Sequence, residues 1–146
     1  MGRFETFSML IAKINRNMRK LKAQEMQQFD LRSSHVQYIY HLYKEKALSL
    51  KQLSEICISD KAAVSRGIDE LQALGYVKQS DRRQYKLFFS LTEAGEEIGE
   101  KLSLRVDSVL KATSLGLSDE ERRAFYNHLT IISENLQRIV DGNLDL

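Results

Sequence analysis

Hydrophobic residues recur at alternating intervals of three and four near both ends of this chain, a spacing typical of helices with one apolar face. In residues 1–30 the apolar positions are Phe4, Phe7, Ile11, Ile14, Met18 and Leu21. A similar stripe near the C-terminus consists of Phe125, Leu129, Ile132, Leu136 and Ile139. The first stripe exceeds what a terminal helix needs for docking on its own domain, so it predicts a partner helix in the same chain or in another.

Capping residues indicate where further helices begin. A Ser or Thr followed three residues later by Glu or Gln can satisfy two backbone N–H groups at a helix start. Such boxes predict helices that run from Ser34 to about Lys46, from Ser49 to about Cys57 and from Ser118 to about Val140. Thr92 can cap another helix, which should end near Gly116.

One more helix is predicted over residues 60–74, with Ser59 or Asp60 as its cap and Gly75 as the left-handed residue that ends it. Its apolar positions are Val64, Ile68, Leu71 and Leu74. After it comes the only region typical of strands. Residues 76–80 and 85–91 flank the polar sequence 80–84, which predicts a β-hairpin with a charged tip.

The composition agrees with this mainly helical pattern. The chain has 146 residues, a single cysteine and no proline. Proline interrupts helices and sheet ladders, so its absence favours long helices joined by short turns. One cysteine excludes an internal disulfide framework, and no stretch approaches the ~20 apolar residues needed to span a bilayer. We expect a single cytoplasmic domain over residues 1–146, with no membrane contact.

Charge is distributed unevenly along the sequence, although the formal net charge is only +2. Residues 1–48 hold nine Lys and Arg against four Asp and Glu, and residues 49–91 hold seven against five. Residues 92–146 reverse the balance, with six against eleven. The basic first two-thirds therefore indicates a surface that faces a polyanion.

Two short helices followed by a hairpin define a winged helix-turn-helix over residues 34–95. The second helix of such a unit can enter the DNA major groove, while the hairpin reaches the backbone or the minor groove. Lys61, Ser65 and Arg66 lie off its apolar stripe and could contact base edges or phosphates. Ser49, Lys51 and Gln52, at the start of the first helix, could hold a phosphate.

Several motifs in this region resemble those of the MarR family of bacterial transcriptional regulators. The matching runs are Ser49-Leu-Lys-Gln-Leu-Ser-Glu-Ile, Ala63-Val-Ser-Arg66, Leu74-Gly75-Tyr76-Val77, Asp81-Arg82-Arg83 and Leu91-Thr92-Glu93-Ala94-Gly95. The resemblance implies a mainly α fold with a small β-hairpin wing. It also implies a homodimer whose helical regions, 1–30 and 96–140, intertwine. This dimer is expected to be a repressor that binds a palindromic operator in double-stranded DNA.

The resemblance assigns the wing a specific role. It implies that Arg83 enters the minor groove while Asp81 orients it. The spacing from Val77 to Asp81 is shorter than usual in the family, so the wing is either short or shifted in register. In a shifted register, Arg82 and Arg83 exchange roles.

Other residues allow additional readings. Tyr38, Tyr40 and Tyr43 suit a pocket for a small apolar or phenolic effector, and core packing explains them equally well. Cys57, between two isoleucines, is expected in the core rather than as an oxidant sensor. The chain carries three histidines, at His35, His41 and His128, but no pair at the i, i+4 spacing of a metal helix, so neither metal nor cofactor is expected.

Three functional hypotheses follow. The preferred one is the DNA-binding regulator. A winged helix used only for protein interaction is the first alternative, and a zinc- or oxidant-gated regulator is the second. No phosphate-binding loop, nucleophile elbow or other catalytic motif is present, so we do not expect an enzyme.

Overall fold

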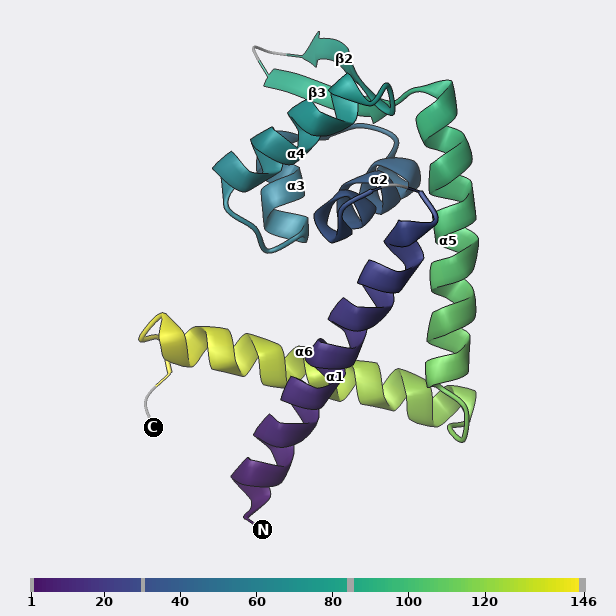
Figure 1. Ribbon diagram of the computed structural model, residues 1–146. Coiled ribbons are helices and arrows are strands. Elements are labelled where there is room, and N and C mark those ends of the chain that lie inside the picture. The colour runs from purple at the N-terminus through teal and green to yellow at the C-terminus, as the bar shows by residue number, and fades with distance from the viewer. Residues whose placement is uncertain (1, 30, 84–85, 145–146) are drawn as a thin grey trace. The chain divides into compact units, whose positions relative to one another are not determined.

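Figure 1 shows a computed structural model of the protein, which describes residues 2–29, 31–83 and 86–144. Within these ranges the chain forms six helices and one three-stranded antiparallel sheet. The elements are α1 Arg3–Gln27, α2 Ser33–Glu45, β1 Leu48–Ser49, α3 Leu50–Ile56, α4 Lys61–Ala73, β2 Val77–Arg83, β3 Lys86–Leu91, α5 Glu93–Thr113 and α6 Asp119–Val140. The predicted fold class, mainly helical with a small β wing, is confirmed.

By its internal contacts the chain divides into two compact units, Met1–Arg105 and Val106–Leu146, and the boundary falls inside α5. The buried core lies entirely in the first unit. Its apolar residues are Leu31, Val36, Tyr38, Ile39, Leu42, Leu48, Leu53, Val64, Ile68, Leu71, Val77, Phe89, Leu91 and Leu102. We call the part of the chain that holds this core, residues 31–105, the lobe.

The two longest helices contribute nothing to that core. None of the described side chains of α1 or α6 is buried. Ile14 in α1 is 52% exposed and Leu136 in α6 is 50% exposed. Their apolar stripes, which the sequence predicted, are therefore left largely open within a single chain. Among the described residues, no helix is both long enough and apolar enough to cross a bilayer.

Most of the predicted helix starts are confirmed. Ser49 and Gln52 form the capping box of α3, and Ser118 and Glu121 form that of α6. For α4 the cap is Asp60, whose side chain accepts a hydrogen bond from the Ala63 N–H at 2.9 Å. These short-range signals work because both partners of each bond lie within one helical turn.

The start of α2 was predicted wrongly. The helix begins at Ser33 with Arg32 as its N-cap, and the predicted box of Ser34 and Gln37 does not form. The imidazole Nδ1 of His35 instead accepts a hydrogen bond from the Arg32 N–H at 3.3 Å. Imidazole is not a common capping group, so a search for Ser or Thr misses it.

The sheet also corrects the prediction. A short strand that the sequence analysis missed, β1, pairs antiparallel with β3, with Leu48 opposite Phe89 and Ser49 opposite Phe88. The order β1–β3–β2 therefore joins the start of α3 directly to the wing. A two-residue strand has too little sequence to show alternation, and only its pairing partner reveals it.

The turn after α4 is built as predicted, around Gly75 at φ +80°. Leu74 beside it is 51% exposed, so its predicted place on the apolar face is wrong, because the helix ends at Ala73. Thr92 then joins two helices through one hydroxyl. Its Oγ1 donates to the Gly75 carbonyl at 2.6 Å and accepts from the Gly95 N–H at 3.1 Å, at the start of α5.

Candidate nucleic-acid interface

Helix α4 is fixed in the lobe by one buried face. Val64, Ile68 and Leu71 are fully buried, three or four residues apart. Together with the Asp60 cap, this burial leaves the remaining surface of the helix free to carry polar side chains. Lys61 and Arg66 are exposed on it and Ser65 is half-buried.

Gly67 allows α2 to pack very closely behind α4. A Cβ atom at this position would lie 2.4 Å from Cε2 of the Tyr38 ring, closer than real contacts allow. Tyr38 is 3% exposed, and its burial raises the pKa of its phenol. The glycine in the middle of α4, which costs about 1 kcal/mol of helix propensity, therefore serves helix packing.

A polar network that sequence reasoning missed ties α4 to the start of α2. His35 is buried, and its Nε2 lies 2.8 Å from Glu70 Oε2. Nδ1 of His35 accepts a hydrogen bond from the Arg32 N–H, so the ring proton is on Nε2. Nε2 therefore donates a hydrogen bond to the Glu70 carboxylate. Arg32 Nη1 donates to the other Glu70 oxygen at 3.1 Å. Every polar atom of His35 is thus satisfied inside the lobe, which no local sequence pattern could show.

Ser49 and Gln52 at the start of α3 bond to each other. Ser49 Oγ accepts from the Gln52 N–H at 3.3 Å, and Gln52 Oε1 accepts from the Ser49 N–H at 2.9 Å. Lys51, the third residue predicted to hold a phosphate here, is exposed. Its Nζ lies 3.9 Å from Glu55 Oε1, one turn further along the helix.

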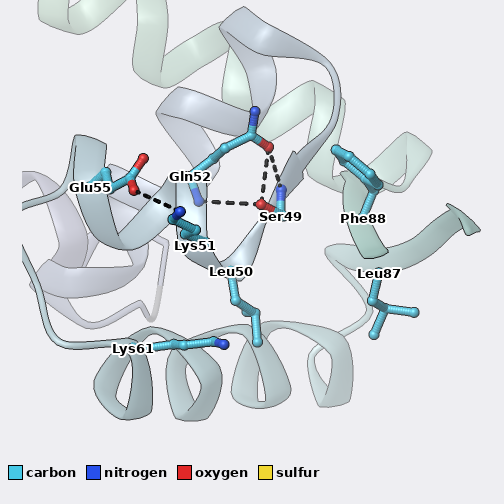
Figure 2. Close-up of a pocket in the computed structure, with 8 residues that line it drawn as sticks. All are labelled: Ser49, Leu50, Lys51, Gln52, Glu55, Lys61, Leu87 and Phe88. Atoms are coloured by element: carbon cyan, nitrogen blue, oxygen red, sulfur yellow. Dashed lines mark hydrogen bonds and ion pairs between the residues drawn. The ribbon is translucent and has the colours of Figure 1, made fainter. Parts of the chain in front are cut away.

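A cleft of about 490 Å³ opens between α3, the first residue of α4 and strand β3. Figure 2 shows Lys51 and Lys61 on one side of it and Leu87 and Phe88, from β3, on the other. The pairing of β1 with β3 sets Ser49 opposite Phe88, and both residues line the cleft. The structure brings together two cations and an apolar wall that are far apart in the sequence.

The wing differs from the predicted hairpin. Strand β2 extends to Arg83, so Asp81, Arg82 and Arg83 lie in the strand rather than at a tip formed by residues 80–84. Ser80 pairs with Phe88 and Arg83 pairs with Lys86, which leaves one extra residue on β2 between them. The extra residue forms a bulge in β2. The side chains of these three residues lie outside what the structure describes.

The tyrosines predicted to line an effector pocket have other neighbours in the lobe. Tyr38 packs on Gly67, and a Cβ at Gly99 would lie 2.8 Å from the Tyr43 Cβ. Tyr40 is half-buried and makes an edge contact with the His41 ring. Packing within the lobe accounts for Tyr38 and Tyr43.

Cys57 and the histidines have structural surroundings too. Cys57 is half-buried against the core, where burial raises the pKa of its thiol, as expected for a packing residue. Burial lowers the pKa of His41. In the part of the chain that the structure describes, no three His, Cys, Asp or Glu residues gather as metal ligands would.

Comparison with known proteins agrees with this geometry. Residues 29–84, which include most of the winged helix-turn-helix, match the MarR family. This match agrees with the expectation of a regulator rather than an enzyme. No curated protein matches the chain closely enough to count as a relative.

Solved structures show the same fold over nearly the whole length. A MarR family regulator from Neisseria meningitidis has a TM-score of 0.83 and 20% identity, with 99% of this chain and 100% of that chain covered. A MarR family regulator from Listeria monocytogenes, in complex with a 26mer DNA, has a TM-score of 0.80 and 17% identity over 93% and 95%. The S. aureus MepR–DNA complex has a TM-score of 0.78 and 20% identity over 89% and 97%.

Proposed function

We propose that this chain is a sequence-specific DNA-binding regulator that acts as a homodimer and represses transcription by occupying a palindromic operator. The observation that supports this most directly is α4, which is anchored by a fully buried apolar face and carries Lys61, Ser65 and Arg66 on its remaining surface. The chain has the same fold as two proteins whose structures were solved with DNA.

In this proposal the lobe divides its contacts between bases and backbone. Arg66 and Ser65 read base edges in the major groove, where Arg pairs well with guanine and Ser serves several partners. Arg83, oriented by Asp81, enters the minor groove from the wing, and in a shifted register Arg82 takes this role instead. Ser49, Lys51 and Gln52 contact the phosphate backbone beside the groove.

The dimer rests on the open stripes of the two long helices. On α1 the stripe includes Phe4, whose side chain lies outside the described part, and Phe7, Ile11, Ile14 and Met18. On α6 it consists of Phe125, Leu129, Ile132, Leu136 and Ile139, with no buried residue on the whole helix. Contiguous apolar surface of this extent marks an association interface. A second copy of this chain is the occupant that we propose, because two-fold symmetry of the protein matches a palindromic operator.

Release by a small apolar or phenolic effector in the cytoplasm completes the proposal. Since Tyr38 and Tyr43 are used in packing, Tyr40 is the member of the predicted set best placed to meet a ligand. Titration of small phenols into the protein–DNA complex tests this part by itself, with Tyr40→Phe as the matched variant.

The function itself is tested by selection of duplexes from a randomised pool, followed by anisotropy titrations over a salt series. We expect a recovered palindrome, and an affinity that falls steeply with salt because bound counterions are released. A protein-interaction module would recover no duplex. A zinc- or oxidant-gated regulator would bind but would respond to added zinc, or to oxidant in a manner abolished by Cys57→Ser.

A further inference from the structure

The cleft between α3, α4 and β3 separates Lys61 from the other polar residues of α4. Successive residues of an α-helix lie about 100° apart, so Lys61 and Arg66 point about 140° apart around the axis. Arg66 lies nearly opposite the buried Val64 and Ile68, whereas Lys61 lines the cleft. One duplex groove cannot receive both side chains in the same way.

The chemistry of the cleft suits a sugar–phosphate backbone. Lys51 and Lys61 supply two compact positive charges, which bind phosphate oxygens without demanding a particular geometry. Leu50, Leu87 and Phe88 form an apolar wall that can pack against deoxyribose. Gln52 also lines the cleft, and its amide could pair with adenine, but its Oε1 already accepts a hydrogen bond from the Ser49 N–H at 2.9 Å.

We infer that this cleft seats the backbone of one DNA strand, so that Lys61 is a phosphate clamp together with Lys51 and not a reader of bases. The inference rests on the proposed DNA-binding function and assigns a different task to one of its predicted residues. Sequence preference then comes from Arg66, Ser65 and the wing alone.

Glu55 limits the strength of this clamp. Its carboxylate is the only acidic group that lines the described part of the cleft, and it lies 3.9 Å from the Lys51 ammonium. Both side chains are mostly exposed, at 78% for Lys51 and 63% for Glu55. A phosphate in the cleft therefore competes with Glu55 for Lys51, and loss of this carboxylate should tighten binding.

The test compares Lys61→Gln, Lys61→Arg and Arg66→Ala in the full chain, on the best selected duplex and on a scrambled duplex of equal length. We expect Lys61→Gln to weaken both complexes by about fivefold to tenfold and to reduce the salt slope by about 1, while Lys61→Arg restores binding. Arg66→Ala should instead reduce the difference between the two duplexes, because it weakens the selected complex more than the scrambled one. Lys111→Gln removes the same charge from α5 and serves as the control.

Glu55→Gln provides an independent measurement with the opposite sign, because it should tighten both complexes by about twofold. A Lys61→Gln effect confined to the selected duplex, or one with an unchanged salt slope, would overturn the clamp. A wild-type chain that binds no duplex at all would overturn the proposed function instead. Circular dichroism of each variant verifies the fold, and Lys61→Arg retains both charge and helix.

Discussion

The lobe and the two long helices use apolar residues in opposite ways. In the lobe, residues such as Ile39, Leu42 and Leu53 are fully buried by neighbours from the same chain. In α1 and α6 the apolar stripes are just as regular in sequence, but none of their described side chains is buried. Periodicity alone therefore predicts a helix and its apolar face, and it does not reveal whether that face is covered within the chain or by another molecule.

The largest expected effect is a loss of stability in the lobe. Leu42→Ala should lower the free energy of unfolding by about 2–5 kcal/mol, because Leu42 is 0% exposed and its truncation leaves a cavity. Urea denaturation measures this, and the loss should be the same at every protein concentration. If the loss of unfolding free energy became smaller at higher protein concentration, the lobe would be stabilised by association. The lobe would then not differ from α1 and α6 in how its apolar residues are covered.

A charge on the α6 stripe should act on association instead. Leu136→Glu should weaken the dimer by about 2 kcal/mol or more, since Leu136 belongs to the stripe and is half exposed in the single chain. Light scattering over a dilution series measures this. Asn135→Ala, on the neighbouring exposed position, serves as the control. An unchanged dimer would show that α6 is not the interface.

The wing offers a third contrast, because it should affect DNA binding without affecting association. Arg83→Ala should weaken operator binding by about 1–3 kcal/mol and leave the dimer intact. Anisotropy at fixed salt measures the affinity. If Arg82→Ala has this effect and Arg83→Ala has none, the bulge in β2 has exchanged their roles.

The smallest effect concerns a helix cap. Ser118→Ala should destabilise α6 by about 0.5–2 kcal/mol, whereas the equivalent change at Ser49 should destabilise the lobe. Hydrogen bonds from Ser118 lower the pKa of the Glu121 carboxyl from 4.5. This box therefore stabilises the protein at pH values above about 4.5, and its contribution is lost as the pH falls through the lowered pKa. Acid titration of the wild type and of Glu121→Gln should converge at low pH, where the Glu121 carboxyl is neutral.

The sequence allowed prediction of whatever depends on neighbours within one helical turn. The caps at Ser49, Asp60 and Ser118 and the turn at Gly75 are of this kind. So are the helical stripes and the hairpin, which together defined the winged helix. The family motifs then added the expected wing residues.

What the sequence could not provide were contacts between distant segments. Strand β1 is recognisable only by its pairing with β3, and the buried His35 only by Glu70, which follows 35 residues later. The cleft that contains Lys61 depends on three elements at once. Lys61 was therefore grouped with Arg66 by proximity in sequence, although the helix points them in different directions.

The hydroxyl of Thr92 has a mechanical consequence. It connects the turn that ends α4 to the first turn of α5. Gly95 can pack there because it has no Cβ, which would lie 2.1 Å from the Tyr76 carbonyl oxygen. Helix α5 then continues without interruption past the end of the lobe to Thr113. Within the lobe, the end of α4 and the first turn of α5 are therefore linked through this hydroxyl.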